Sequence, residues 1–169
     1  MTLAYIGLGA NLDDPGEQLA RAVAAIDALE QSTIEALSGV YHSPPMGPQD
    51  QPDYLNAVLA LTTTMSPSTL LAALQVIEDA QGRQRTERWG ARTLDLDILL
   101  FGNKVVALPD LQIPHPGLTQ RDFALLPLLE IAGPNLVLPG GEELGTLVAG
   151  CREGTLQRTS QQLDRYIRT

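Results

Sequence analysis

Two aspartates separated by one residue are the side chains of this sequence best suited to chemistry. Asp95 and Asp97 lie in the segment TLDLDI, residues 93–98. Side chains alternate along a strand, so both carboxylates would share one face, roughly 6.5–7 Å apart. Mg²⁺ suits such a pair because it takes one or two protein carboxylates and leaves its other positions to water and phosphate oxygens. The alternative is a solvent-exposed strand face with alternating acids.

A group of arginines precedes these acids. Arg83, Arg85, Arg88 and Arg92 lie within ten residues, in a chain whose 11 Lys and Arg face 20 Asp and Glu for a formal net charge of −9. So acidic a chain is not expected to bind nucleic acid, which needs a broad basic face. Guanidinium groups beside a carboxylate pair can hold phosphates between themselves and a metal ion. The cluster therefore predicts a nucleotide phosphate site, with a solvated charged loop as the alternative.

A second set of residues could recognise a flat heterocycle. Tyr54 and Asn56 would share a strand face, where an amide can read the edge of a ring and a phenol can stack on its plane. Trp89 and Phe123 add two aromatic side chains, and the proline-containing segment 43–46 could form a stiff wall. Ordinary core packing and a rigid connector are the alternatives for these residues.

The elements that must position these residues alternate between strand and helix. Apolar periodicity and capping residues predict strands over 3–8, 33–42, 54–63 and 93–101, one helix from about residue 15 to 32, and a second from Pro67 to near Gly82. The order β-α-β-β-α-β is that of the ferredoxin-like arrangement. The expected fold class is α+β, with an antiparallel sheet, two helices on one face, and a C-terminal extension.

The second half of the chain is expected to extend this core. Residues 101–104 predict a hairpin turn, with 105–108 returning as a short strand, and 123–132 predict a helix. Residues 1–150 are expected to form a single domain and 151–169 a peripheral tail.

Composition limits the class of protein. A chain of 169 residues with 44% hydrophobic residues can bury one core without staples. Its single cysteine, Cys151, excludes an internal disulfide framework, and no apolar run approaches the length of a membrane span. The glycines at 7 and 9 lack the spacing of a P-loop, and no metalloprotease or hydrolase motif occurs. We expect a soluble, cytoplasmic monomer that does not bind nucleic acid or membranes.

Four segments, taken in order, resemble the 6-hydroxymethyl-7,8-dihydropterin pyrophosphokinase family of folate synthesis. They are residues 9–12, 41–56, 82–98 and 114–127. The resemblance implies an enzyme that transfers pyrophosphate from ATP, its co-substrate, to the hydroxymethyl group of the pterin and releases AMP. It also implies two Mg²⁺ ions and in-line attack on the β-phosphorus, with Asp97, Asp95 or water left open as the proton acceptor.

The same resemblance assigns roles residue by residue. It implies that the metal ligands are Asp95 and Asp97, and that the catalytic set consists of Arg83, Arg92, Asp95 and Asp97. Pterin-binding residues would be Ser43, Pro44, Pro45, Met46, Tyr54, Asn56, Trp89 and Phe123. ATP-binding residues would be Gln75, Glu78, Arg83, Arg85, Arg92, Ile98, His115 and Arg121.

The chain departs from the family pattern at four positions, namely Ala91, Asp110, Gln112 and Gly117. These departures concern the surroundings of the nucleotide and leave the aspartate pair in place. Two other classes of function remain as alternatives to the enzyme. One is a regulatory module that binds a nucleotide without chemistry, and the other is a scaffolding domain that binds no ligand.

Overall fold

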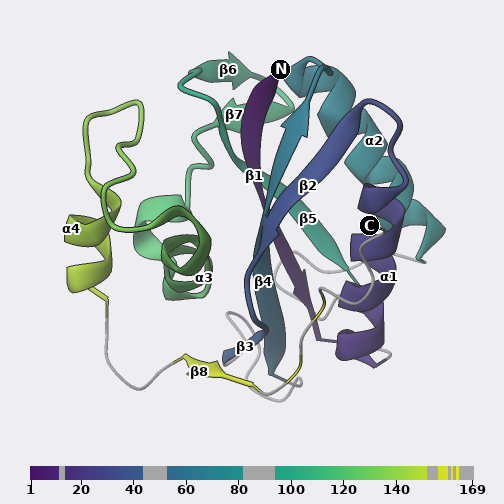
Figure 1. Cartoon of the computed structure of the whole chain (residues 1–169), viewed down its shortest axis with the longest axis horizontal. Coiled ribbons are helices and arrows are strands. Elements are labelled where there is room, and N and C mark those ends of the chain that lie inside the picture. Colours follow the sequence, from purple (N-terminus) through teal and green to yellow (C-terminus); the bar gives the residue numbers. More distant parts are fainter. Residues whose placement is uncertain are drawn as a thin grey trace.

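An antiparallel sheet forms the centre of the molecule (Figure 1). The computed structural model describes residues 1–11, 14–43, 53–81, 94–151, 156–159, 161 and 163. The sheet follows the order β5-β1-β4-β3-β8, and β2 also pairs with β4. Its strands are β1 (Thr2–Ala10), β2 (Ser32–Leu37), β3 (Tyr41–Ser43), β4 (Tyr54–Thr63), β5 (Asp95–Phe101) and β8 (Gln157–Arg158). The α+β class with an antiparallel sheet is confirmed.

Two helices cover one face of the sheet, α1 (Pro15–Asp27) and α2 (Pro67–Ala80) (Figure 1). The side chains of Asp14 and Ser66 accept the N–H groups of Glu17 and Thr69, and a proline opens each helix. The opposite face carries the short helix η1 (Leu118–Gln120), α3 (Asp122–Ala132) and α4 (Leu144–Ala149). Among the described residues, no helix combines the length and apolar character needed to cross a membrane.

The side chains of β1 point alternately to the two faces of the sheet. Ala4, Ile6 and Leu8 are buried in the core that α1 and α2 share with the sheet. Tyr5 points to the opposite side and belongs to the core beneath α3 and α4. Beyond Tyr5, this second face has Gly7 and Gly9 in place of side chains.

The predicted strand 33–42 is wrong as one element, because it is divided into β2 and β3. Ser38 interrupts the ladder: its backbone N–H donates to Val58 O at 2.9 Å, and its hydroxyl accepts the Val58 N–H at 2.9 Å. The hydroxyl thus takes the place of a backbone carbonyl, and residues 38–40 belong to neither strand.

The predicted hairpin of 101–104 with a return strand over 105–108 is also wrong in its pairing. The turn forms, with Gly102 at φ 53° and Lys104 N–H donating to Phe101 O. However, β6 (Val106–Leu108) pairs with β7 (Leu111–Ile113) and not with β5. At the outer edge of β5, the carbonyl of Leu99 instead accepts the N–H of His115 at 3.0 Å.

The segment after residue 150 returns to the sheet. Strand β8 pairs with β3, with Tyr41 opposite Arg158 and His42 opposite Gln157. Leu163 is 1% exposed and belongs to the core beneath α1 and α2. The tail expected to be peripheral therefore contributes a strand and a core side chain.

Glu130 on α3 is the centre of a polar cluster at this edge. Its carboxylate accepts hydrogen bonds from Gly39 N–H (3.0 and 3.2 Å), the Tyr41 hydroxyl (2.7 Å) and the Arg158 guanidinium (3.3 and 3.4 Å). Burial raises the pKa of Glu130, but these hydrogen bonds outweigh it, so the pKa lies below the ordinary 4.5. Burial and Glu130 together raise the pKa of Tyr41 to about 12.

We predict that Glu130→Gln lowers the free energy of unfolding by about 1–2 kcal/mol at pH 7, because the charged acceptor is lost. A depressed carboxyl pKa contributes stability fully above the unfolded value of 4.5 and loses it as pH falls through the folded value. The difference in unfolding free energy between wild type and variant should therefore become smaller below about pH 4.5. Urea unfolding measured stepwise from pH 7 to pH 3 would show this. A gap that stays constant across this range would contradict the assignment.

Candidate active site

A cavity of about 260 Å³ opens on the face of the sheet that carries η1 and α3. Strands β1, β4 and β5 form its floor and sides, Ser43 closes one end, and the segment from His115 to Ala124 lies over it. The cavity thus combines polar side chains from adjacent strands with a cover that contains both apolar side chains and the polar His115 and Arg121.

Register across the sheet explains why the cavity exists. Gly9 lies between Asp95 on β5 and Asn56 on β4, and Gly7 lies in the same way between Asp97 and Val58. Neighbouring strands are roughly 4.8 Å apart, so about 10 Å separates the acidic strand from the amide strand. Because the middle strand has glycines here, a groove floored by backbone runs between them. We call Gly7 and Gly9 the glycine floor.

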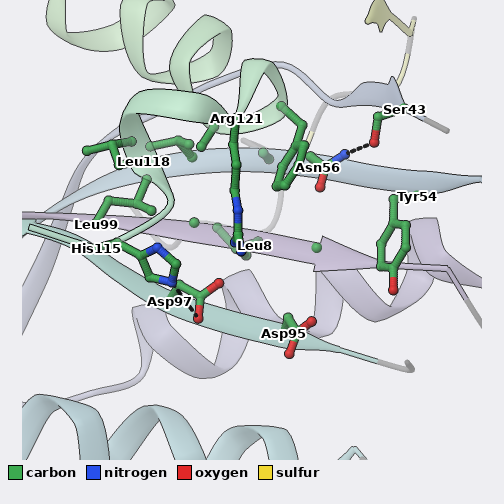
Figure 2. A pocket seen from close by; sticks show the side chains of 16 residues that line it. Leu8, Ser43, Tyr54, Asn56, Asp95, Asp97, Leu99, His115, Leu118 and Arg121 are labelled. Atoms are coloured by element: carbon green, nitrogen blue, oxygen red, sulfur yellow. Dashed lines mark hydrogen bonds and ion pairs between the residues drawn. The ribbon is translucent and has the colours of Figure 1, made fainter. Parts of the chain in front are cut away.

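The acidic side of the cavity contains Asp95, Asp97 and His115 (Figure 2). His115 Nε2 lies 3.8 Å from Asp97 Oδ1, and His115 Nδ1 accepts the Gly117 N–H at 3.1 Å. Burial lowers the pKa of His115 below its ordinary 6.5, and the positive charge of Arg121 lowers it further. The hydrogen-bond pattern assigns the ring hydrogen of the neutral imidazole to Nε2, which faces Asp97.

The opposite side presents an amide in a fixed orientation. Asn56 is 5% exposed, and its Nδ2 donates to Ser43 Oγ at 2.7 Å. Its Oδ1 lies over Gly9, where a Cβ atom would approach it to 3.2 Å. Tyr54 lines the same end of the cavity, two residues before Asn56 on β4 (Figure 2).

Arg121 brings a cation into the cavity from above. Figure 2 shows its side chain extending from the α3 side towards β1. Its guanidinium carbon lies 5.6 Å from the ring centroid of Phe123, a cation–π distance. Arg121 therefore places a positive charge in the cavity that Asp95, Asp97 and His115 also line.

Asp95 and Asp97 fit a magnesium ion better than a metal held by protein ligands alone. Both carboxylates line the cavity, and the Asp97 side chain is 45% exposed. In the part of the chain that the structure describes, no three His, Cys, Asp or Glu side chains gather as a metal site. Mg²⁺ keeps several waters or phosphate oxygens and binds through one or two carboxylates, as this pair allows.

The family model for 7,8-dihydro-6-hydroxymethylpterin-pyrophosphokinase (HPPK) matches residues 5–133. The chain belongs to this family. It is therefore an enzyme, a pyrophosphokinase, and the matched range contains every described residue that lines the cavity.

Two curated relatives and one crystal structure illustrate the family. The Haemophilus influenzae 2-amino-4-hydroxy-6-hydroxymethyldihydropteridine pyrophosphokinase is 51% identical over 148 residues, 88% of this chain and 92% of that protein. The Pseudomonas aeruginosa protein of the same name is 49% identical, over 87% of this chain and 90% of its own. The structure of Plasmodium falciparum HPPK-DHPS wild type with pteroate is 14% identical with a TM-score of 0.70. It covers 88% of this chain but only 42% of that longer one, and shows the fold alone.

The cavity brings together eight of the residues that the family resemblance singles out. They come from four parts of the chain and are Ser43, Tyr54, Asn56, Asp95, Asp97, His115, Arg121 and Phe123. Seven others lie outside the described residues, namely Pro44, Pro45, Met46, Arg83, Arg85, Trp89 and Arg92. The individual roles of all these residues stay predictions.

Three residues expected to bind ATP are not among those lining this cavity. Ile98 is 3% exposed and belongs to the core beneath α1 and α2. Glu78 is 2% exposed, and its Oε2 accepts the Leu96 N–H at 2.9 Å, which ties α2 to the strand of the aspartates. Gln75 lies one turn earlier on α2. Their contacts to a nucleotide also stay predictions.

Sequence reasoning missed the glycine floor and the apolar part of the cover. Gly7 and Gly9 alternate with the buried Ile6 and Leu8, so the sequence indicates a strand face without side chains. It does not indicate which residues of the neighbouring strands lie beside that face. The cover includes Leu118 and Ala124, which belong to the core beneath α3 and α4. No local pattern distinguishes these two from other core residues.

Proposed function

We propose that this enzyme transfers pyrophosphate from ATP to the hydroxymethyl group of 6-hydroxymethyl-7,8-dihydropterin and releases AMP, as a step of folate biosynthesis. The observation that carries the proposal is one cavity with carboxylates on one side, an oriented amide on the other, and the glycine floor between them. The names of the curated relatives support the same substrate.

The amide side suits the pterin. Because Ser43 Oγ takes one Asn56 N–H, the rest of the carboxamide remains for a ring that presents both donors and acceptors at its edge. Tyr54 and Phe123 supply aromatic faces for stacking. The glycine floor leaves the height that a flat ring needs between these side chains.

The acidic side suits the triphosphate. Asp95 and Asp97 would hold two Mg²⁺ ions, which, when bound, offset charge on the attacking and leaving oxygens of an in-line displacement at the β-phosphorus. His115 would donate its Nε2 hydrogen, and Arg121 its guanidinium hydrogens, to phosphate oxygens. These residues act by positioning and charge, the main sources of acceleration in phosphoryl transfer.

We infer that the core is ferredoxin-like. The strands β1, β2 with β3, β4 and β5, joined through α1 and α2, supply the β-α-β-β-α-β order. The order β5-β1-β4 followed by β2 and β3 supports this assignment. In this arrangement the first strand, β1, lies between β5 and β4, which places the glycine floor between the aspartates and Asn56.

The proposal is tested by incubating the protein with ATP, Mg²⁺ and 6-hydroxymethyl-7,8-dihydropterin and measuring AMP. We expect AMP only when pterin is present and only until EDTA is added. A parallel reaction without pterin measures any hydrolysis of ATP.

Two outcomes would contradict the proposal. Pterin-dependent ADP would mean attack on the γ-phosphorus and ordinary kinase chemistry. Nucleotide binding without any product, from protein that unfolds cooperatively, would favour the regulatory module over the enzyme.

A further inference from the structure

The C-terminal strand β8 lies against β3, which leads directly to the cavity. Besides the pairing of β8 with β3, the N–H of Thr159 donates to Val40 O at 2.8 Å. Figure 1 shows β8 running past β3 at the end of the sheet away from the N-terminus. Strand β3 has only three residues, so β8 supplies its pairing along the edge that faces away from β4.

The segment after β8 is anchored as well. The side chain of Gln161 donates to Gly16 O at 3.2 Å, at the first turn of α1. Leu163 is buried against the main core. These contacts hold the described C-terminal residues at two points beyond β3, so β8 is fixed in place as part of the folded domain.

Glu130 joins β3 to α3, two of the elements that surround the amide end of the cavity. Through Gly39 and Tyr41 it binds the beginning of β3, whose last residue, Ser43, accepts the Asn56 side-chain N–H. Glu130 itself lies on α3, so these hydrogen bonds hold the beginning of β3 against that helix. Arg158 from β8 completes the cluster by binding both carboxylate oxygens of Glu130.

We propose that Glu130 and Arg158 are positioning residues for the pterin end of the active site. They hold β3 against α3 and β8 so that Ser43 keeps the Asn56 amide oriented towards the cavity. Neither residue lines the cavity, so they act through β3. This inference rests on the proposed function for the identity of the substrate, and it gives strand β8 a role in substrate binding.

The acidic side of the cavity serves as an internal control for effects on the amide end. Asp95, Asp97 and His115 lie on β5 and on the segment after β7, and β5 is separated from β3 by β1 and β4. Loss of the Glu130 cluster should therefore disturb the amide end more than the phosphate end. A general loosening of the fold would disturb both.

The test is steady-state kinetics of Arg158→Gln and Glu130→Gln with each substrate varied in turn. We expect the KM for the pterin to rise about three- to tenfold in each variant, with the KM for ATP unchanged. Arg158→Lys should recover part of the loss, because it restores the charge without the paired donors. Arg21→Gln is the matched control, since this exposed arginine on α1 pairs only weakly with Glu17, at 4.0 Å.

A second readout is independent of turnover. The side-chain NH₂ resonances of Asn56 should shift or exchange faster in Arg158→Gln than in Arg21→Gln. Unchanged Asn56 resonances together with an unchanged pterin KM would overturn the inference, as would equal increases in both KM values. An inactive wild type would refute the proposed function alone, and the resonances would still decide whether Glu130 and Arg158 orient Asn56.

Discussion

Asp97→Asn is expected to lower the rate of pterin-dependent AMP release by about 10³-fold, or about 4 kcal/mol of transition-state stabilisation. The substitution keeps the shape of the side chain and removes its charge, so the position can no longer hold Mg²⁺ as a carboxylate does. The fold should be unaffected, because the Asp97 side chain is 45% exposed and faces the cavity.

The measurement is AMP formation over a range of Mg²⁺ concentrations, with urea unfolding on the same samples. Removing one of two neighbouring like charges should leave the unfolding midpoint equal to or slightly above that of wild type. Asp79→Asn is a suitable control, because this exposed carboxylate lies on α2 and outside the cavity. Full turnover by Asp97→Asn would show that Asp97 is not a ligand of the metal ion.

Gly9→Val is expected to lower kcat/KM for the pterin by about 10²-fold, the loss typical of a reactant misplaced by about 1 Å. A Cβ atom at this position would lie 3.2 Å from Asn56 Oδ1, and the two methyl groups would project over the floor of the cavity. The Asn56 amide would have to turn, and the ring would lose the space beneath it.

This effect should not come from unfolding. Gly9 has ordinary extended backbone, which valine can adopt. Valine also lowers the conformational entropy of the unfolded chain and favours β structure. Turning the Asn56 amide breaks its buried hydrogen bond with Ser43, so we expect the unfolding free energy to fall by about 1–3 kcal/mol, which leaves the protein folded. Leu3→Val places the same side chain on the same face at the far end of β1 and should leave kcat/KM unchanged. A Gly9→Val variant with normal pterin kinetics would mean that the substrate does not lie over Gly9.

The features that the sequence predicts best are those that depend on neighbouring residues. Strand β4 occupies 54–63 as predicted, and Ser66 caps α2 with Pro67 in its first turn. The pairing of Asp95 with Asp97 on one face follows from the two-residue period of a strand. Each of these can be recognised within a window of about ten residues.

Features that depend on distant residues could not be predicted. Ser38 breaks the second strand through a hydrogen bond to Val58, twenty residues away. Strand β6 pairs with β7 because another segment occupies the edge of β5. The site also depends on residues that are distant in sequence. The glycine floor requires the register of three strands, and the Glu130 cluster joins residues from Gly39 to Arg158.

The glycine floor has a consequence for inhibitors and for resistance to them. A compound that packs against Gly7 and Gly9 contacts backbone that is already paired on both sides with β4 and β5, so this surface cannot easily move away from it. If the pterin lies over Gly9 as proposed, mutation offers little escape either, because a larger side chain at Gly9 that blocks the inhibitor would also block the substrate. Resistance to compounds that bind this surface should therefore arise more slowly than resistance to compounds that bind the side chains around it. The mutations that do arise should lie outside Gly7 and Gly9.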